Sequence, residues 1–414
     1  MLDDHTPRTS RAKEPLEAAR HDDDAEPSIE AMLGTPANNT LTAKADGKGA
    51  GPLGGIRRDL LRDASAIPRL ADLAALRVLL TGESVIDGGR AWFRSREAVD
   101  EFLRLSGYDT DNPLDMARLQ ELHEDAVAYL TEVHGYKLPA DVEEPADIHD
   151  LFLVASFGPQ RLRRPACMTL KVMHILQHIA GRELAFNMPI SEAQLLDRLN
   201  AKVFALVDRL RAQKLGVREF AAGKKTRNSL VTKLLAKRDT LATHIFDRLR
   251  YRVVFESREN IVQALLLMIR ELFPYNYVVP EQSLNGIIVP ADLARVLELP
   301  LDVVESCWGG ASAQVGVDGQ SPTPQNEFSG ATYRCVNFVA DIPIRIDDLA
   351  PDEAPAIAYV QAEIQLVDVE TERANNAGEN AHPRYKARQR ERVQRRLEAG
   401  ADTGLETAVN DDEG

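Results

Sequence analysis

The sequence predicts an α+β protein, in which an all-α region precedes a mixed β-sheet flanked by helices. Between residues 60 and 213, apolar side chains recur at three- and four-residue spacing, which is typical of amphipathic helices. After Lys214, helical segments are interrupted by runs that alternate apolar and polar residues, as half-buried strands do. Residues 1–55 carry almost no large apolar side chains, so we expect them to be disordered. The expected parts are therefore a disordered tail (1–55), a helical domain (56–213), an α/β domain (214–396) and an acidic tail (397–414).

Composition limits the class of protein. The 414 residues carry a net charge of −14, which argues against bulk attraction to nucleic acid or to an anionic membrane. The longest apolar run, at residues 261–269, is about half the length that spans a bilayer. The three cysteines, Cys167, Cys307 and Cys335, cannot pair evenly and lack metal-ligand spacing, so we interpret them as reduced thiols. These features predict a soluble cytoplasmic protein with no membrane partner.

The helical region is expected to hold about five helices. Stop and start signals set their bounds: Ser106 with Gly107 ends one helix, Gly181 ends another, and Ser191 before Glu192 opens the last. The expected helices are LADLAALRVLL, REAVDEFLRLSG, MARLQELHEDAVAYLTEVHG, CMTLKVMHILQHIAGREL and ISEAQLLDRLNAKVFALVDRLRAQ.

The α/β region alternates short strands and helices. GVREFAAG and RLRYRVVFE are expected strands, YNYVVP a short extended piece, and ATYRCVNFVADIPIRI and AIAYVQAEIQLVD two long strands that can pair. SLVTKLLAKRD, ENIVQALLLMIRELF and PADLARVLEL are expected helices, and a loop is expected between Gly309 and Gly330. HPRYKARQRERVQRRLEAG predicts a basic helix, with Pro383 suited to its first turn.

The last long strand carries an unusual polar face. Gln361, Glu363 and Gln365 alternate with apolar residues, so they share one side of the strand. Asp247 directly precedes an earlier strand. Two carboxylates on neighbouring strands suit one Mg²⁺, which prefers hard oxygen ligands and keeps positions for water or phosphate. The alternatives are a solvated Glu363 and an Asp247 that serves only in a turn.

Basic residues near Asp247 are candidate phosphate ligands. Lys225, Ser229 and Lys233 are four residues apart and fall near one face of a helix, whose N-terminus would also offer N–H groups to an anion. The alternative interpretation is a solvated basic face. The further basic candidates are Lys224, Arg227, Arg250 and Arg252. His174 and His178 have the spacing of a metal pair, but we interpret them as packing histidines because no third ligand is near. We also discount His149-Asp150 as a metal motif, since the further His and Asp of a metal phosphohydrolase are missing.

Two blocks of the chain resemble RelA/SpoT-type synthetase domains. KKTRNSLVTKLLAKRDTLATHIFDRLRYR, at residues 224–252, is similar to the first signature stretch of that family, and residues 363–386 are similar to its closing stretch. The matching positions of the first block are Lys225, Ser229, Lys233, Asp247 and Arg252, with one extra residue before Asp247. Those of the second are Glu363, Ile364, Gln365, Gly378, Ala381, His382, Arg384, Tyr385 and Lys386, without a gap. The resemblance covers roughly residues 215–390.

This resemblance implies a nucleotidyltransferase-like fold and Mg²⁺-dependent transfer of pyrophosphate from ATP to the 3′-hydroxyl of a guanine nucleotide. Such a pyrophosphokinase makes the alarmone of the stringent response. By the same resemblance, Asp247 holds Mg²⁺, and Glu363 contacts the metal or acts as general base. The implied nucleotide and phosphate ligands are Lys225, Ser229, Lys233, Arg252, Gln365, His382, Tyr385 and Lys386.

Four positions depart from the family's pattern. The family's basic or base-recognising residues are replaced by Gly223, Ala331, Cys335 and Val367. Tyr333 follows two residues after Ala331, so strand alternation places it on the same side as the missing tyrosine. The metal half of the expected site is thus retained and the base-recognition half altered, which leaves the acceptor open.

Two alternatives therefore stand beside the synthetase. One is a catalytically silent module that binds a nucleotide or RNA; the other is a pyrophosphokinase acting on an adenine nucleotide or the 3′ end of tRNA. The basic helix from Arg384 to Arg396 suits an RNA partner, although a merely solvated helix has the same composition. The sequence gives no oligomeric state.

Overall fold

The computed structural model describes residues 65–88, 91–187, 190–224, 226–236, 249–308, 332–346, 356–377 and 382–398. The two expected tails, apart from residues 397 and 398, and the expected loop at 309–330 lie outside these residues. Among the described helices, none is both long and apolar enough to cross a membrane.

A five-stranded mixed sheet organises the α/β part, in the order β1-β2-β5-β4-β3. Its strands are β1 (Val217–Lys224), β2 (Leu249–Phe255), β3 (Leu284–Asn285), β4 (Val336–Arg345) and β5 (Ile357–Asp368). β2 and β5 run parallel, while the other neighbours are antiparallel. The predicted α+β class with a mixed sheet is confirmed.

The central strand β5 is buried on both faces, so the half-buried strand expected from its alternation was wrong. Ile364 and Leu366 on the apolar face are 2% and 0% exposed, and Glu363 and Gln365 on the polar face are only 6% and 8% exposed. The polar side chains escape solvent because arginines of β2 lie over them. Alternation predicted the two faces correctly but not what covers the second one.

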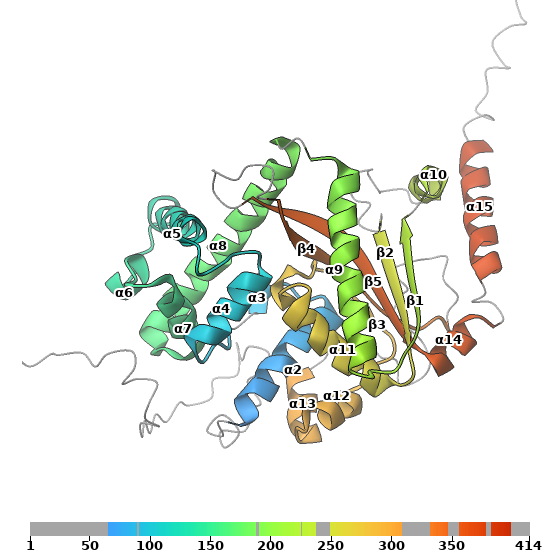
Figure 1. The fold of residues 1–414 in the computed structure, drawn as a ribbon, viewed down its shortest axis with the longest axis horizontal. Helices are drawn as coiled ribbons and strands as arrows, with labels where there is room; N and C mark the ends of the chain where they lie inside the picture. Colours follow the sequence, from blue (N-terminus) through green and yellow to red (C-terminus); the bar gives the residue numbers. More distant parts are fainter. Residues whose placement is uncertain are drawn as a thin grey trace, which may run out of the picture. The chain divides into compact units, whose positions relative to one another are not determined.

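Helices pack on the apolar face of the sheet and form the main core (Figure 1). These helices are α2 (Ala66–Thr81), α9 (Glu192–Ala212), α11 (Arg258–Glu271), α12 (Pro290–Leu297) and α13 (Leu301–Trp308). Tyr251, Val253 and Phe255 alternate along β2 and point into this core. Ser191 caps α9 with a full capping box, as its sequence predicts. The core thus combines helices of the predicted helical domain, α2 and α9, with the sheet.

The remaining helices of the first half form a second layer around α8 (Gln160–Asn187), seen in cyan and green in Figure 1. They are α3 (Val85–Gly88), α4 (Arg96–Leu105), α5 (Pro113–Ala128), the π-helical turn η1 (Tyr129–Val133), α6 (Ala140–Glu143) and α7 (Ile148–Phe157). α4 ends at Ser106 and Gly107 as predicted, with Gly107 at a φ of +103° that suits glycine. These elements exceed the five helices expected. The four- and five-residue turns carry no periodicity, and the ten-residue α7 is buried nearly all round, so its apolar run shows no helical period either.

Gly181 does not end a helix, contrary to the prediction, but lies inside α8. A Cβ atom at this position would lie 2.4 Å from the Tyr359 ring of β5 and 3.0 Å from the carbonyl oxygen of Ile357. The glycine therefore lets α8 approach β5 closely. A sequence pattern cannot distinguish such a packing glycine from a helix stop.

The YNYVVP segment begins as a 3₁₀ turn, η3 (Tyr275–Tyr277), and continues in extended conformation at Val278, which bridges to Ala340 of β4. The expected extended piece is therefore confirmed only in its second half. Tyr277 is fully packed against the rings of His174, His178 and Tyr359. This tertiary packing overrides the strand preference of the two tyrosines. It also confirms that the two histidines pack within the fold.

Three helices remain among the described elements: α10 (Arg227–Ala236) after β1, α14 (Val369–Asn375) after β5, and α15 (His382–Glu398). The basic helix α15 was predicted. It packs beside α10, where the Arg396 guanidinium donates to the Leu235 carbonyl at 2.6 Å (Figure 1).

Candidate functional site

The parallel pairing of β2 with β5 places the end of the first sequence block (224–252) next to the start of the second (363–386). Arg250 is the register partner of Glu363, and Arg252 is the partner of Gln365. Paired residues of neighbouring strands point to the same face, so these four side chains form one polar row. We call Arg250, Arg252, Glu363 and Gln365 the polar row.

Glu363 is a buried carboxylate held by one guanidinium. Arg250 donates its Nε to Glu363 Oε2 at 2.8 Å and its Nη2 to Oε1 at 3.2 Å. The Glu363 side chain is 8% exposed, while the Arg250 side chain is 40% exposed and reaches solvent. The interpretation of Glu363 as a solvated surface carboxylate is therefore wrong. A two-pronged pair of this kind fixes the orientation of the carboxylate.

Arg252 is the most enclosed cation of the polar row. Its guanidinium bonds to Gln365 Oε1 at 2.5 Å and to the Tyr333 hydroxyl at 3.3 Å, and it pairs with the Glu372 carboxylate of α14. Burial alone would lower the pKa of Arg252, but Tyr333 and Glu372 raise it overall. Arg252 therefore remains a fixed positive charge at all accessible pH values. Tyr333, which alternation placed on this side, does lie here.

Three of the four departing positions are described. Gly223 pairs with Arg250 across β1 and β2, and a Cβ added there would meet nothing within 4 Å. Val367 is fully buried. Cys335 is also buried, and burial raises the pKa of its thiol to about 12, so it stays protonated near neutral pH. Ala331 lies outside the described residues.

Of the other predicted site residues, the structure describes some and not others. Asp247 and Lys225 lie outside the described residues, so the expected Asp247–Glu363 pair stays a prediction. Lys233 lies in α10, and His382 and Tyr385 lie in the first turn of α15, with backbone placement alone described. The Lys386 side chain is half-buried and donates to Gln389 Oε1 at 3.5 Å.

Ser229 helps to begin α10. Its backbone N–H donates to the Thr226 Oγ1 at 3.3 Å, and the two hydroxyls are 3.1 Å apart. Thr226 thus caps the helix, which begins at Arg227. This contact orders the N-terminal turn that was expected to face an anion.

Sequence reasoning missed two residues of the site. Glu372, the carboxylate partner of Arg252, lies on α14, and no spacing in the sequence relates it to β2. Asn337 of β4 is the register partner of Gln365, and its Oδ1 is buried with no hydrogen-bond partner among the described residues. A buried acceptor without a hydrogen-bond partner destabilises the folded protein, so Asn337 Oδ1 is a position where a bound molecule can donate a hydrogen bond.

The donor set suits a hard cation only in part. Glu363 and Glu372 carry carboxylate oxygens, which Mg²⁺ accepts, but Arg250 and Arg252 occupy them in this structure. No group of three or more His, Cys, Asp or Glu residues with metal-binding geometry occurs within the described ranges. Mg²⁺ binding through Asp247 and Glu363 therefore stays a prediction.

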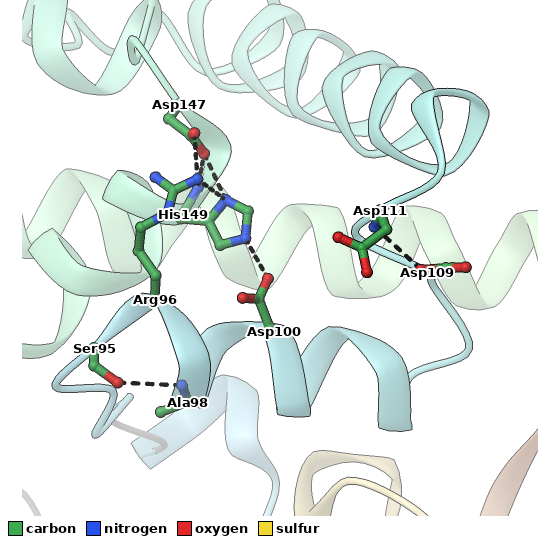
Figure 2. Close-up of polar contacts among 8 residues, drawn as sticks. All are labelled: Ser95, Arg96, Ala98, Asp100, Asp109, Asp111, Asp147 and His149. Atoms are coloured by element: carbon green, nitrogen blue, oxygen red, sulfur yellow. Dashed lines mark hydrogen bonds and ion pairs between the residues drawn. The ribbon is translucent and has the colours of Figure 1, made fainter.

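A second charged cluster lies away from the sheet, between α4 and α7 (Figure 2). The buried His149 ring contacts Asp147 Oδ1 at 2.5 Å and Asp100 Oδ1 at 2.8 Å, and Arg96 donates to Asp147 Oδ2 at 2.6 Å. Burial alone would raise the pKa of Asp147, but its bonds from the His149 backbone and from Arg96 lower it to about 2. His149 thus pairs with Asp147 and Asp100 and ties two helices together, which agrees with discounting His149-Asp150 as a metal motif.

Comparison with solved structures gives likenesses to alarmone synthetases. Small alarmone synthetase 1 from Bacillus subtilis, bound to its product pppGpp, has 15% identity and a TM-score of 0.29, over 50% of this chain and 86% of that one. A GTP pyrophosphokinase family protein from Streptococcus pneumoniae has 14% identity and a TM-score of 0.27, over 52% and 93%. Small alarmone synthetase 2 from Bacillus subtilis has 15% identity and a TM-score of 0.25, over 53% and 91%.

These proteins belong to the group that the two sequence blocks resemble. At such identities and TM-scores, the likeness by itself decides nothing about substrate or activity. No protein-family model matches the chain, and no curated protein matches it.

Proposed function

We propose that the polar row is the centre of a nucleotide site, at which pyrophosphate is transferred from ATP to the 3′-hydroxyl of a guanine nucleotide. The observation that supports this best is the parallel pairing of β2 with β5. Two blocks more than a hundred residues apart resemble one synthetase family. The end of the first lies in β2 and the start of the second in β5, with the matching residues Arg252 and Gln365 in register.

The arrangement of charges suits phosphoryl chemistry. Arg250 and Arg252 present guanidinium groups beside a buried carboxylate, and Arg250 reaches solvent, where it can exchange Glu363 for a phosphate. Fixed positive groups that neutralise charge developing on phosphates are the main protein contribution in such transfers. The freed Glu363 carboxylate can then accept the proton of the attacking hydroxyl.

Mg²⁺ would be held by Glu363 together with Asp247. When bound, it would neutralise phosphate charge and orient the phosphate chain. Among the remaining ligands, Lys225 and Lys233 would contact phosphates, and Ser229 would support the α10 N-terminus. His382, Tyr385 and Lys386 would line the site from the start of α15.

A second candidate is a catalytically silent nucleotide-binding module. The pair between Arg250 and Glu363 favours it, because a carboxylate held by two hydrogen bonds is unavailable to a metal or a proton until Arg250 leaves. The replaced positions Gly223, Cys335 and Val367 favour it too. A transferase with another acceptor, an adenine nucleotide or the tRNA 3′ end, would retain the same polar row.

A product assay distinguishes these functions. The full chain is incubated with ATP labelled on its β-phosphate, Mg²⁺ and, in separate reactions, GDP, GTP, ADP or deacylated tRNA, and the products are resolved by anion exchange. We expect label in a guanine nucleotide carrying a 3′-pyrophosphate. Label found only in another acceptor would mean that the enzyme is a pyrophosphokinase for that acceptor. Nucleotide binding without transfer would support the silent module, and absence of nucleotide binding would contradict both functions.

A further inference from the structure

A cavity of about 110 Å³ lies in the helical layer, away from the polar row. It is bounded by residues of α3, α4, α5, α7, α8 and η3. Three phenylalanines, Phe93, Phe102 and Phe152, form one wall, with ring centroids 5.0, 5.6 and 5.9 Å apart. An enclosed apolar cavity that holds benzene in another protein measures about 150 Å³. The cavity here is smaller but partly open, so an aromatic ligand fills it and extends into the opening.

One side of the cavity is lined by α8, which contributes Lys171, His174 and Gln177. These residues are spaced by three and lie on one helical face, so Lys171 and Gln177 are about 9 Å apart along the axis. The half-buried Lys171 ammonium donates to the Ile86 carbonyl at 2.5 Å. No carboxylate of the described residues pairs with it. Lys171 is thus a cation at the wall of an apolar cavity, with donors left for an anion.

Neutral polar groups lie toward the other end. Asn276 Oδ1 and Gln177 Nε2 are buried and make no hydrogen bond of normal geometry within the described ranges, although Gln177 lies next to the Tyr277 hydroxyl. Burial, followed by the neighbouring His178, lowers the pKa of His174 to about 3, so His174 is neutral and its Nδ1 accepts from Asn276 Nδ2 at 3.2 Å. This contact orients the Asn276 amide and leaves its oxygen free to accept from a ligand.

We propose that this cavity binds a small aromatic carboxylate with a hydroxyl group opposite the acid. The carboxylate pairs with Lys171, the ring packs against the phenylalanines, and the hydroxyl donates to Asn276 Oδ1 while it accepts from Gln177 Nε2. A para-substituted ring with an acetate arm is about as long as the 9 Å rise from Lys171 to Gln177 along α8. The site is independent of the function proposed for the polar row.

Calorimetric titration of the full chain tests the site with three matched probes. They are 4-hydroxyphenylacetate, phenylacetate (which lacks the hydroxyl) and 2-(4-hydroxyphenyl)ethanol (which lacks the acid). Lys171→Met keeps the side-chain stem and removes the charge, and Lys137→Met is the control at an exposed lysine. We expect Lys171→Met to weaken the affinity for 4-hydroxyphenylacetate by about tenfold or more and the affinity for the alcohol by less than about twofold. The reason is that a hydrogen bond to a charged group is lost only for the acid.

Alkylation of Cys167 provides a second readout on the unmodified chain. Cys167 lines the cavity and is partly exposed, whereas Cys307 and Cys335 are buried. Saturating 4-hydroxyphenylacetate should slow the reaction of Cys167 with iodoacetamide. Equal affinity for the acid and the alcohol, or Cys167 alkylation unchanged by the acid, would overturn the proposal even if Lys171→Met failed to fold.

Discussion

Glu363 illustrates what residue patterns predict and what they miss. Alternation along the strand placed Glu363 and Gln365 on one face, and that prediction is confirmed by the register with β2. That β2 lies next to β5 was expected and is confirmed. The burial of Glu363 and its pairing with Arg250 were not predicted, because they depend on the exact register of two strands far apart in the sequence.

Arg252 provides a test of phosphate binding at the residue scale. Arg252→Gln removes an enclosed positive charge while keeping a polar side chain next to Gln365 and Tyr333. We expect the affinity for a non-hydrolysable ATP analogue to fall about tenfold or more, as charge-assisted contacts are worth about 1.5–3 kcal/mol. The control is Arg218→Gln, an exposed arginine of β1 that pairs with Glu256. Equal affinities of the two variants in calorimetric titration would remove Arg252 from the site.

The lowered pKa of Asp147 predicts that the stability of the protein depends on pH. Its pKa is about 2 in the folded protein against an ordinary 3.8, so the charged form is favoured by folding. The stabilisation is therefore complete above about pH 4 and is lost as the pH falls toward 2. For Asp147→Asn we expect a loss of about 1 kcal/mol at pH 7, allowing for solvent screening of this one-third exposed carboxylate.

Urea denaturation at pH 7 and at pH 2.5 checks this dependence. The difference between wild type and Asp147→Asn should shrink at the lower pH. Asp111→Asn, at an exposed position in the same layer (Figure 2), should show little difference at either pH. A difference for Asp147→Asn that is the same at both pH values would mean that its charge does not contribute.

At the scale of elements, long periodic segments were predicted well and short ones were not. The helices α9 and α11 and the strands β2, β4 and β5 follow their sequence patterns. The ten-residue α7 was not predicted, because it is buried nearly all round and shows no apolar period. The eight-residue α13 and the two-residue β3 were not predicted either. Elements of that length contain too few residues to show a period, and packing against the sheet determines them.

The close contact of α8 with β5 gives a test of packing. Gly181→Ala places a methyl group 2.4–2.5 Å from two carbons of the Tyr359 ring, and that ring is stacked on His178 and cannot move freely. We expect a loss of about 1–3 kcal/mol in the free energy of unfolding, as for other overpacked positions. Gly223→Ala, which meets open space in β1, should leave stability nearly unchanged. Equal urea midpoints for the two variants would show that α8 does not pack on β5 in this way.

At the scale of the whole molecule, the expected division at residue 213 stays a prediction. α2 and α9 share the main core with the sheet, whereas the apolar residues of α4, α5 and α7 lie outside that core. We propose that the layer of α4 to α7 is the part of the helical domain that opens separately.

Hydrogen exchange under increasing denaturant tests this division. Amides of residues 96–157 should exchange through an opening of lower free energy than amides of β4 and β5. Identical denaturant dependence in the two regions would indicate one cooperative unit instead.

The transfer rate of Glu363→Gln tests the central proposal most directly. The amide keeps the size of the side chain and can still accept from Arg250, but it can neither take up a proton nor offer a charged ligand to Mg²⁺. Because Glu363 is buried and paired, we also expect a stability loss of about 1–3 kcal/mol, so the variants are compared at a temperature where both are folded.

Glu370→Gln, the same chemical change at an exposed position of α14, is the matched control. Initial rates of pyrophosphate transfer from labelled ATP should fall about 10²- to 10⁴-fold for Glu363→Gln and change little for Glu370→Gln. A folded Glu363→Gln protein that transfers within about threefold of the wild-type rate would contradict the assignment of Glu363 to the reaction.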